Sequence, residues 1–143
     1  MRKNITLALV AVVGIWLASG CASTPRRDLS KLQGIWVGEE LGGGKGECRV
    51  TISGDSMRFQ GARPQEWYVG KLTLIPNTNP RQATVLIAEC GIQKYVNQTA
   101  KAIYKIKGKT LTIAGNEPGN EVVPTAFERS VASQTRAFVV TRQ

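Results

Sequence analysis

Apolar and polar residues alternate in short runs through most of the chain, and Gly, Pro or Asn separates one run from the next. In one such run, Cys48, Val50 and Ile52 stand on one side of the alternation, and the residues between them are polar. A period of two residues is typical of a strand with one buried face. About eight of these runs follow one another from Gly34 onward, so the pattern predicts an all-β domain.

The connections between the runs are short, and none is long enough for the crossover that parallel strands require. We therefore expect a sequential antiparallel sheet, and about eight strands are enough to close it into a barrel. An open sandwich is the alternative, but closure removes the exposed edges that an open sheet must protect. The expected strands begin at Gly34 and include residues 47–53, 57–59, 67–75, 83–88, 102–106, 111–113 and 138–140.

The beginning of the chain follows a different pattern. Arg2 and Lys3 precede an apolar run from Ile5 to Leu17, and small residues separate this run from Cys21. This order of basic, apolar and small residues is typical of a secretory signal. The run is also shorter than the roughly 20 apolar residues that a membrane-spanning helix needs.

Residues 17–21, with the sequence LASGC, resemble the lipobox of bacterial lipoproteins. The resemblance implies that a signal peptide of residues 1–20 is removed and that Cys21 then carries diacylglycerol and an acylated amino terminus. Several acyl chains hold a protein on a membrane, whereas one chain binds only reversibly. Ala22 stands where an aspartate would mark inner-membrane retention, which favours the outer membrane, facing the periplasm. The alternatives are an ordinary cleaved signal and an uncleaved anchor.

The segment after the cysteine is polar and aperiodic from residue 23 to residue 30, which is typical of a flexible linker. We therefore expect residues 21–31 to contain the lipidated cysteine and a tether. Residues 32–143 are then expected to form a single domain around one core.

Positive charge predominates, with 19 basic and 10 acidic residues and a net charge of +9. Without Arg2 and Lys3 the charge is +7 (17 minus 10). In an exported lipoprotein, anionic lipid head groups are the expected counter-charges, and nucleic acid is not an expected partner.

Lysines recur on one face of an expected strand, at Lys101, Lys105 and Lys107, and Lys109 lies across the following hairpin. Such a face is typical of a solvated outer surface whose lysines discourage edge pairing. Contact with anionic head groups is the second interpretation.

Several short motifs occur in order along the mature chain. They are LQGIW at 32–36, GDSM at 54–57, NPR at 79–81, AIYKI at 102–106 followed by Gly108 and Thr110-Leu111, PTAF at 124–127, and an apolar strand that ends in Arg142. In this order they resemble an uncharacterised lipocalin-like family of small exported domains, frequent in planctomycetes and their relatives. The resemblance implies an eight-stranded lipocalin-like barrel and no particular activity.

The tripeptide at 34–36 also resembles the Gly-x-Trp motif that opens the first strand of lipocalins. The resemblance implies that the indole of Trp36 closes one end of the barrel beneath an arginine of the last strand, for which Arg142 is the matching residue. A guanidinium over an indole gains about 1 to 2 kcal/mol, and its edges still reach backbone carbonyls. We expect a structural role for this pair.

Cys48 and Cys90 remain when Cys21 is assigned to lipid. Because disulfides persist in exported proteins, one interpretation is that the two cysteines are bonded. The other is that both are free thiols packed as small hydrophobic groups. Spacing does not decide between them, since a disulfide needs α-carbons within about 7 Å.

Catalytic chemistry has little support in this chain. It contains no histidine, the most common general base and a frequent metal ligand. Two cysteines cannot complete a zinc site, and GGGKG at 42–46 lacks the hydroxyl residue that follows the lysine of a phosphate-binding loop. The adjacent Glu39 and Glu40 would point to opposite faces of a strand. We expect no enzyme activity, no metal and no cofactor.

Trp67, Tyr68, Leu72 and Tyr104 are the residues that we expect to line a ligand cavity, if the barrel has one. An eight-stranded barrel is just wide enough to hold one small ligand or to fill with side chains. The first case predicts binding of a small apolar or amphipathic molecule. The second predicts an envelope interaction or structural module without a ligand. A cavity of about 300 Å³ would favour binding.

Overall fold

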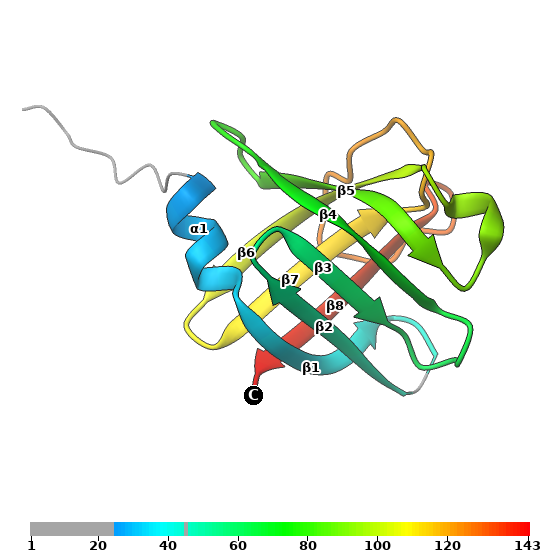
Figure 1. Ribbon diagram of the computed structural model, residues 1–143, viewed down its shortest axis with the longest axis horizontal. Coiled ribbons are helices and arrows are strands. Elements are labelled where there is room, and N and C mark those ends of the chain that lie inside the picture. Colours follow the sequence, from blue (N-terminus) through cyan, green and yellow to red (C-terminus); the bar gives the residue numbers. More distant parts are fainter. Residues whose placement is uncertain (1–24, 45) are drawn as a thin grey trace, which may run out of the picture.

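Eight strands and two short helices make up the computed structural model, which describes residues 25–44 and 46–143 (Figure 1). The helices are α1 (Pro25–Leu32) and the single 3₁₀ turn η1 (Gln93–Tyr95). The strands are β1 (Gly34–Leu41), β2 (Glu47–Ser53), β3 (Ser56–Gln60), β4 (Trp67–Ile75), β5 (Arg81–Cys90), β6 (Thr99–Lys107), β7 (Thr110–Asn116) and β8 (Thr135–Arg142).

The sheet closes on itself. Each strand pairs antiparallel with the next, and β8 returns to pair with β1. The predicted eight-stranded antiparallel barrel is therefore confirmed, and its architecture is consistent with a lipocalin-like barrel. At the seam, a β-carbon on Gly38 would stand 2.0 Å from the carbonyl oxygen of Val139. The close approach of β1 and β8 therefore requires a glycine at this position.

The two-residue alternation separates inward from outward side chains as predicted. Val50 and Ile52 of β2 and Leu72 and Leu74 of β4 point into the barrel and belong to one buried cluster. Apolar burial of this kind contributes on the order of 25 cal/mol per Å². The core thus lies inside the barrel, and it also defines the walls of whatever space remains there.

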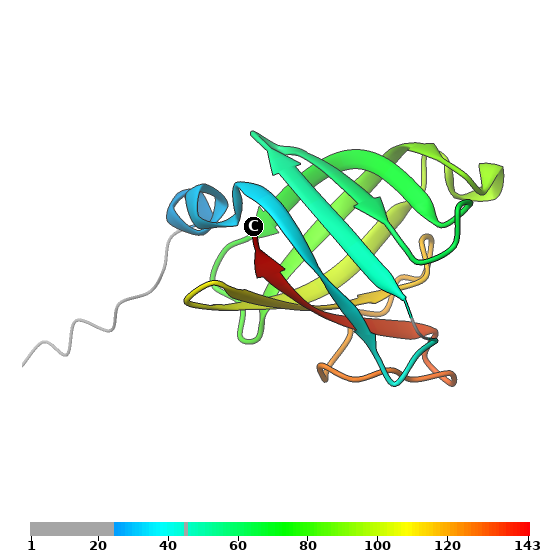
Figure 2. The same cartoon turned by 90° about the horizontal axis from the view of Figure 1, so that it is seen from below.

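A second, smaller cluster lies on the outer surface. Ile103, Ala114 and Ala137 are fully buried, although their neighbours along each strand face the interior. Val123 and Phe127, from the long loop between β7 and β8, pack over them. Figure 2 shows this loop, in orange, against the outside of the barrel. The loop therefore covers part of the face of β6 that carries the lysines.

Two of these lysines contact the covering loop. Lys101 donates to the carboxylate of Glu121 at 2.7 Å, and the ammonium of Lys105 lies 4.6 Å from the ring centroid of Phe127. The positive charge of this strand face is thus partly engaged within the protein. Lys107 and Lys109, at the end of the hairpin, remain exposed.

The expectation of a flexible tether is wrong for its described part, because the chain from Pro25 onward forms α1. Proline suits the first position of a helix, and the early Asp28 and late Lys31 complement the helix dipole. Asp28 and Leu32, one turn apart, are both buried against the barrel. Cys21 and the signal segment lie outside the described residues.

Candidate ligand-binding cavity

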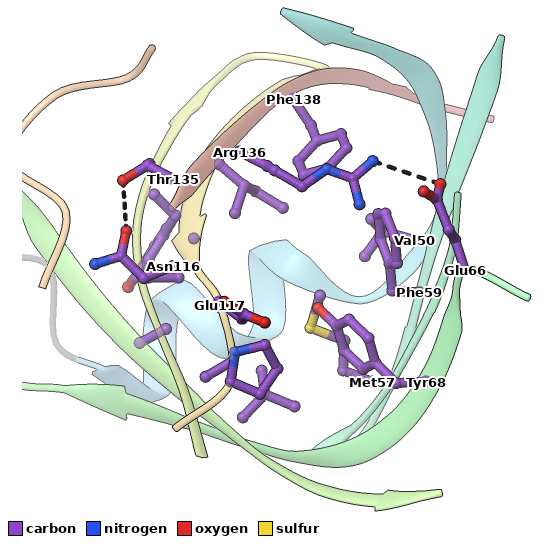
Figure 3. Close-up of a pocket in the computed structure, with 18 of the residues that line it drawn as sticks. Val50, Met57, Phe59, Glu66, Tyr68, Asn116, Glu117, Thr135, Arg136 and Phe138 are labelled. Atoms are coloured by element: carbon purple, nitrogen blue, oxygen red, sulfur yellow. Dashed lines mark hydrogen bonds and ion pairs between the residues drawn. The ribbon is translucent and has the colours of Figure 1, made fainter. Parts of the chain in front are cut away.

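The barrel contains a cavity of about 460 Å³ that opens at one end. Its lining includes residues of the loops that follow β3, β5 and β7. These loops lie at one end of the barrel, which we call the mouth. At the other end, which we call the closed end, Leu32 of α1 reaches the lining. Figure 3 shows the lining residues, with α1 behind them.

All four residues that the sequence analysis expects to line a cavity do line this cavity. Trp67 and Tyr68 begin β4 near the mouth, Leu72 lies farther along the same strand, and Tyr104 belongs to β6. Leu72 and Tyr104 are buried, whereas Trp67 and Tyr68 retain partial exposure. The lining is otherwise mostly apolar.

The space exists because three adjacent strands carry very small side chains at inward positions. Ala83 of β5 pairs with Ala102 of β6, and Ala102 pairs with Gly115 of β7. All three residues line the cavity. Cross-strand partners have β-carbons about 5 Å apart, so together these residues leave a strip of wall with almost no side-chain volume. The sequence analysis missed this strip, although its signal was present in the inward positions.

Three aromatic rings form another part of the wall. The ring of Phe59 stacks on that of Tyr68 with centroids 5.3 Å apart, and it meets the edge of Phe138 at 5.1 Å. Such pairs contribute about 0.5 to 1.5 kcal/mol beyond their burial. They give the cavity a rigid apolar surface, and Figure 3 shows Phe59, Tyr68 and Phe138 around the space.

The hydroxyl of Tyr68 is a polar group with no hydrogen-bond partner among the described residues. No fully buried side-chain nitrogen or oxygen in the described chain lacks a partner, so this hydroxyl retains surface toward the cavity. Burial raises the pKa of Tyr68 to about 12. The group is therefore a neutral hydrogen-bond donor and acceptor at physiological pH.

Trp36 and Arg142 close the opposite end, as the resemblance implied. They are paired residues of β1 and β8, and the guanidinium carbon lies 4.5 Å from the indole centroid. The indole nitrogen donates to the carbonyl oxygen of Leu32 at 2.8 Å, and the guanidinium donates to that of Lys31. Both side chains thus bind the last carbonyls of α1, where cations and donors are favoured.

A buried carboxylate holds α1 against the barrel. The hydroxyl of Tyr104 donates to Asp28 at 3.0 Å, and Arg81 approaches the same carboxylate at 3.4 Å. Burial, followed by the hydrogen bond to Asp28, raises the pKa of Tyr104 well above its ordinary value. The helix is therefore part of the folded barrel and fixes the cavity floor.

An ion network lies at the mouth. Arg136 donates from Nε and from a terminal nitrogen to the two oxygens of Glu40, at 2.9 and 2.7 Å, and it lies 3.5 Å from Glu66. Its guanidinium also lies 5.3 Å from the ring centroid of Phe138. The hydrogen bond from Arg136 lowers the pKa of Glu40, and the same bond raises the pKa of Arg136. Glu40 and Arg136 are therefore both charged at neutral pH, and each satisfies the other's charge within the protein.

A second polar group borders the mouth. The carboxylate of Glu117 accepts hydrogen bonds from Tyr95, Lys94 and Gln134. The bond from Tyr95 lowers the pKa of Glu117. The sequence analysis missed both networks. Neither spacing nor composition indicates that Glu40 and Arg136, which are 96 positions apart in the sequence, form a hydrogen bond.

The disulfide does not form, since Cys48 and Cys90 are both free. Cys48 lies on β2 and Cys90 at the end of β5, with β3 and β4 between them. Three steps of about 4.8 Å along the sheet separate these strands, well beyond the reach of a disulfide. Burial raises the pKa of Cys48 to about 11.

Within the described part of the chain, no cluster of three or more histidine, cysteine, aspartate or glutamate side chains could hold a metal ion. Neither described helix is long and apolar enough to cross a membrane. No known protein family, curated protein or solved structure matches the chain.

Proposed function

We propose that the protein binds one small amphipathic molecule inside its barrel. The observation that carries this proposal is the cavity of about 460 Å³, which exceeds the lower end of the usual range for ligand pockets. An interaction module with a filled barrel would have no such space. The apolar walls suit the body of the molecule, while the Tyr68 hydroxyl and the mouth suit a hydrogen-bonding group.

The setting that we propose is the bacterial cell envelope, with the chain anchored through lipid on Cys21 and facing the periplasm. The lipobox-like sequence at 17–21 supports this part of the proposal. In the same proposal the barrel belongs to a lipocalin-like family of exported domains and carries rather than transforms its ligand. Palmitate labelling of the parent but not of Cys21→Ser is the expected result, and equal labelling of both would contradict anchoring at this residue.

Binding can be tested with N-phenyl-1-naphthylamine, an apolar probe whose fluorescence rises in apolar surroundings. Ala102→Phe places a ring in the strip of small side chains and should abolish the fluorescence increase. Ala88→Phe, at an exposed position of β5, is the matched control and should bind as the parent does. Thermal unfolding must show that both variants are folded.

Two results would overturn the proposal. One is the absence of any fluorescence increase with the parent protein, combined with native mass spectrometry that detects no bound molecule after extraction from its source. The other is equal binding by Ala102→Phe and Ala88→Phe, which would place the probe outside the barrel.

A further inference from the structure

Positive charge is concentrated at the closed end of the barrel. Arg26, Arg27 and Lys31 are exposed on α1, and Lys107 and Lys109 are exposed on the β6–β7 hairpin. We call these five residues the basic cluster. Figures 1 and 2 both show α1 and this hairpin at the same end of the molecule, away from the loops of the mouth.

Hydrogen bonds connect the two parts of the cluster. The backbone nitrogen of Arg142 donates to the carbonyl oxygen of Lys109 at 2.9 Å, and its guanidinium donates to the carbonyl oxygen of Lys31. Asp28 attaches the helix to the barrel wall from its buried side. The basic cluster is therefore presented by a fixed surface rather than by a loose terminal segment.

Carboxylates do little to neutralise this surface. The closed end has two acidic residues, Asp28 and Asp55. Each forms an ion pair with a residue outside the basic cluster, Asp28 with Arg81 and Asp55 with Lys71. The other eight of the 10 acidic residues (10 minus 2) lie in the halves of strands nearer the mouth or in its loops.

The basic cluster is not neutralised by ion pairs with the described residues. None of its five side chains forms an ion pair with any residue in 25–44 or 46–143. The acidic residues that could compete for them are gathered toward the opposite end. The barrel is thus electrostatically polarised along its axis.

We propose that the basic cluster docks the closed end on an anionic lipid surface and leaves the mouth facing away from it. Each lysine or arginine near such a surface strengthens binding on the order of fivefold. The chain also enters the barrel at this end, through α1. A ligand then enters and leaves on the side remote from the lipid. This proposal is independent of ligand binding and of acylation.

The test uses a chain of residues 22–143, which contains α1 and every strand of the closed barrel. Co-sedimentation is measured with phosphatidylcholine vesicles and with vesicles that also contain phosphatidylglycerol, at low and at high salt. Arg27→Gln combined with Lys109→Gln should weaken binding to the anionic vesicles on the order of 25-fold. Arg49→Gln combined with Arg63→Gln, at exposed positions nearer the mouth, removes the same charge and should change binding little.

Docking through the basic cluster should also disappear at high salt, because the Debye length falls to about 3 Å at 1 M. Equal loss in the two double variants would show a response to net charge alone and would overturn the proposal. So would equal binding to the two kinds of vesicle. Binding of N-phenyl-1-naphthylamine without vesicles tests the cavity separately, and thermal unfolding shows that each variant is folded.

Discussion

Replacement of Tyr68 by phenylalanine removes one hydroxyl from the cavity wall and leaves the ring stacked on Phe59. Because that hydroxyl has no partner among the described residues, its loss leaves no buried group unsatisfied, and stability at neutral pH should change by less than about 1 kcal/mol. A ligand whose polar group bonds to this hydroxyl should lose about 0.5 to 1.5 kcal/mol of binding free energy, roughly 2- to 13-fold in Kd. N-phenyl-1-naphthylamine should bind both forms equally.

The same substitution should change the response of the fold to alkali. Burial raises the pKa of Tyr68 from 10.0 to about 12, so the folded barrel keeps the phenol neutral where the unfolded chain ionises it. The unfolded state then binds fewer protons, and the free energy of unfolding falls as the pH rises from 10 toward 12. Below pH 10 the contribution of Tyr68 is fully present. The rise of the pKa from 10.0 to about 12 corresponds to at most about 3 kcal/mol of unfolding free energy.

Urea unfolding followed by circular dichroism measures this difference. The free energy of unfolding of the parent should fall more steeply than that of Tyr68→Phe above pH 10, and the two should agree near pH 7. Parallel curves over the whole alkaline range would show that the hydroxyl is solvated and would refute the reasoning. An equal loss of affinity for polar ligands and for the apolar probe would refute the assigned hydrogen-bonding role.

Three further predictions concern the frame around the cavity. Trp36→Ala should cost about 3 to 5 kcal/mol of stability, and the double variant with Arg142→Ala should lose about 1 to 2 kcal/mol less than the sum of the single variants, as chemical unfolding would show. In the native chain of residues 22–143, iodoacetamide should modify the partly exposed Cys90 and leave the buried Cys48, whose pKa is raised, unmodified until urea is added. Equal modification of both cysteines in the native protein, measured by mass spectrometry, would contradict this. Gly38→Ala should lower the melting temperature by several degrees, because the new methyl group would collide with β8. An unchanged melting curve would contradict this, because it would mean that β1 and β8 can move apart without loss of stability.

The sequence could predict features that depend on neighbouring residues, but not features that depend on contacts between residues far apart in the chain. The strands were predictable because alternation such as that of Val50 and Ile52 is visible within a few residues and directly reflects which face is buried. Helix α1 was not, because its polar composition conceals that Asp28 is buried by Tyr104, 76 positions away. Likewise, Arg136 becomes a mouth residue only through Glu40, which the barrel closure brings beside it.

The cavity could be predicted from the sequence only in part. Alternation already identified the inward positions, and side-chain size at those positions is also written in the sequence. What the sequence did not contain was the register that puts Ala83, Ala102 and Gly115 side by side on three strands. A small residue on one strand leaves a gap that a neighbour can fill, whereas three in register leave a gap that no neighbour fills. Register therefore decides whether this barrel is filled or hollow, and Ala102→Phe tests that dependence at the middle of the three strands.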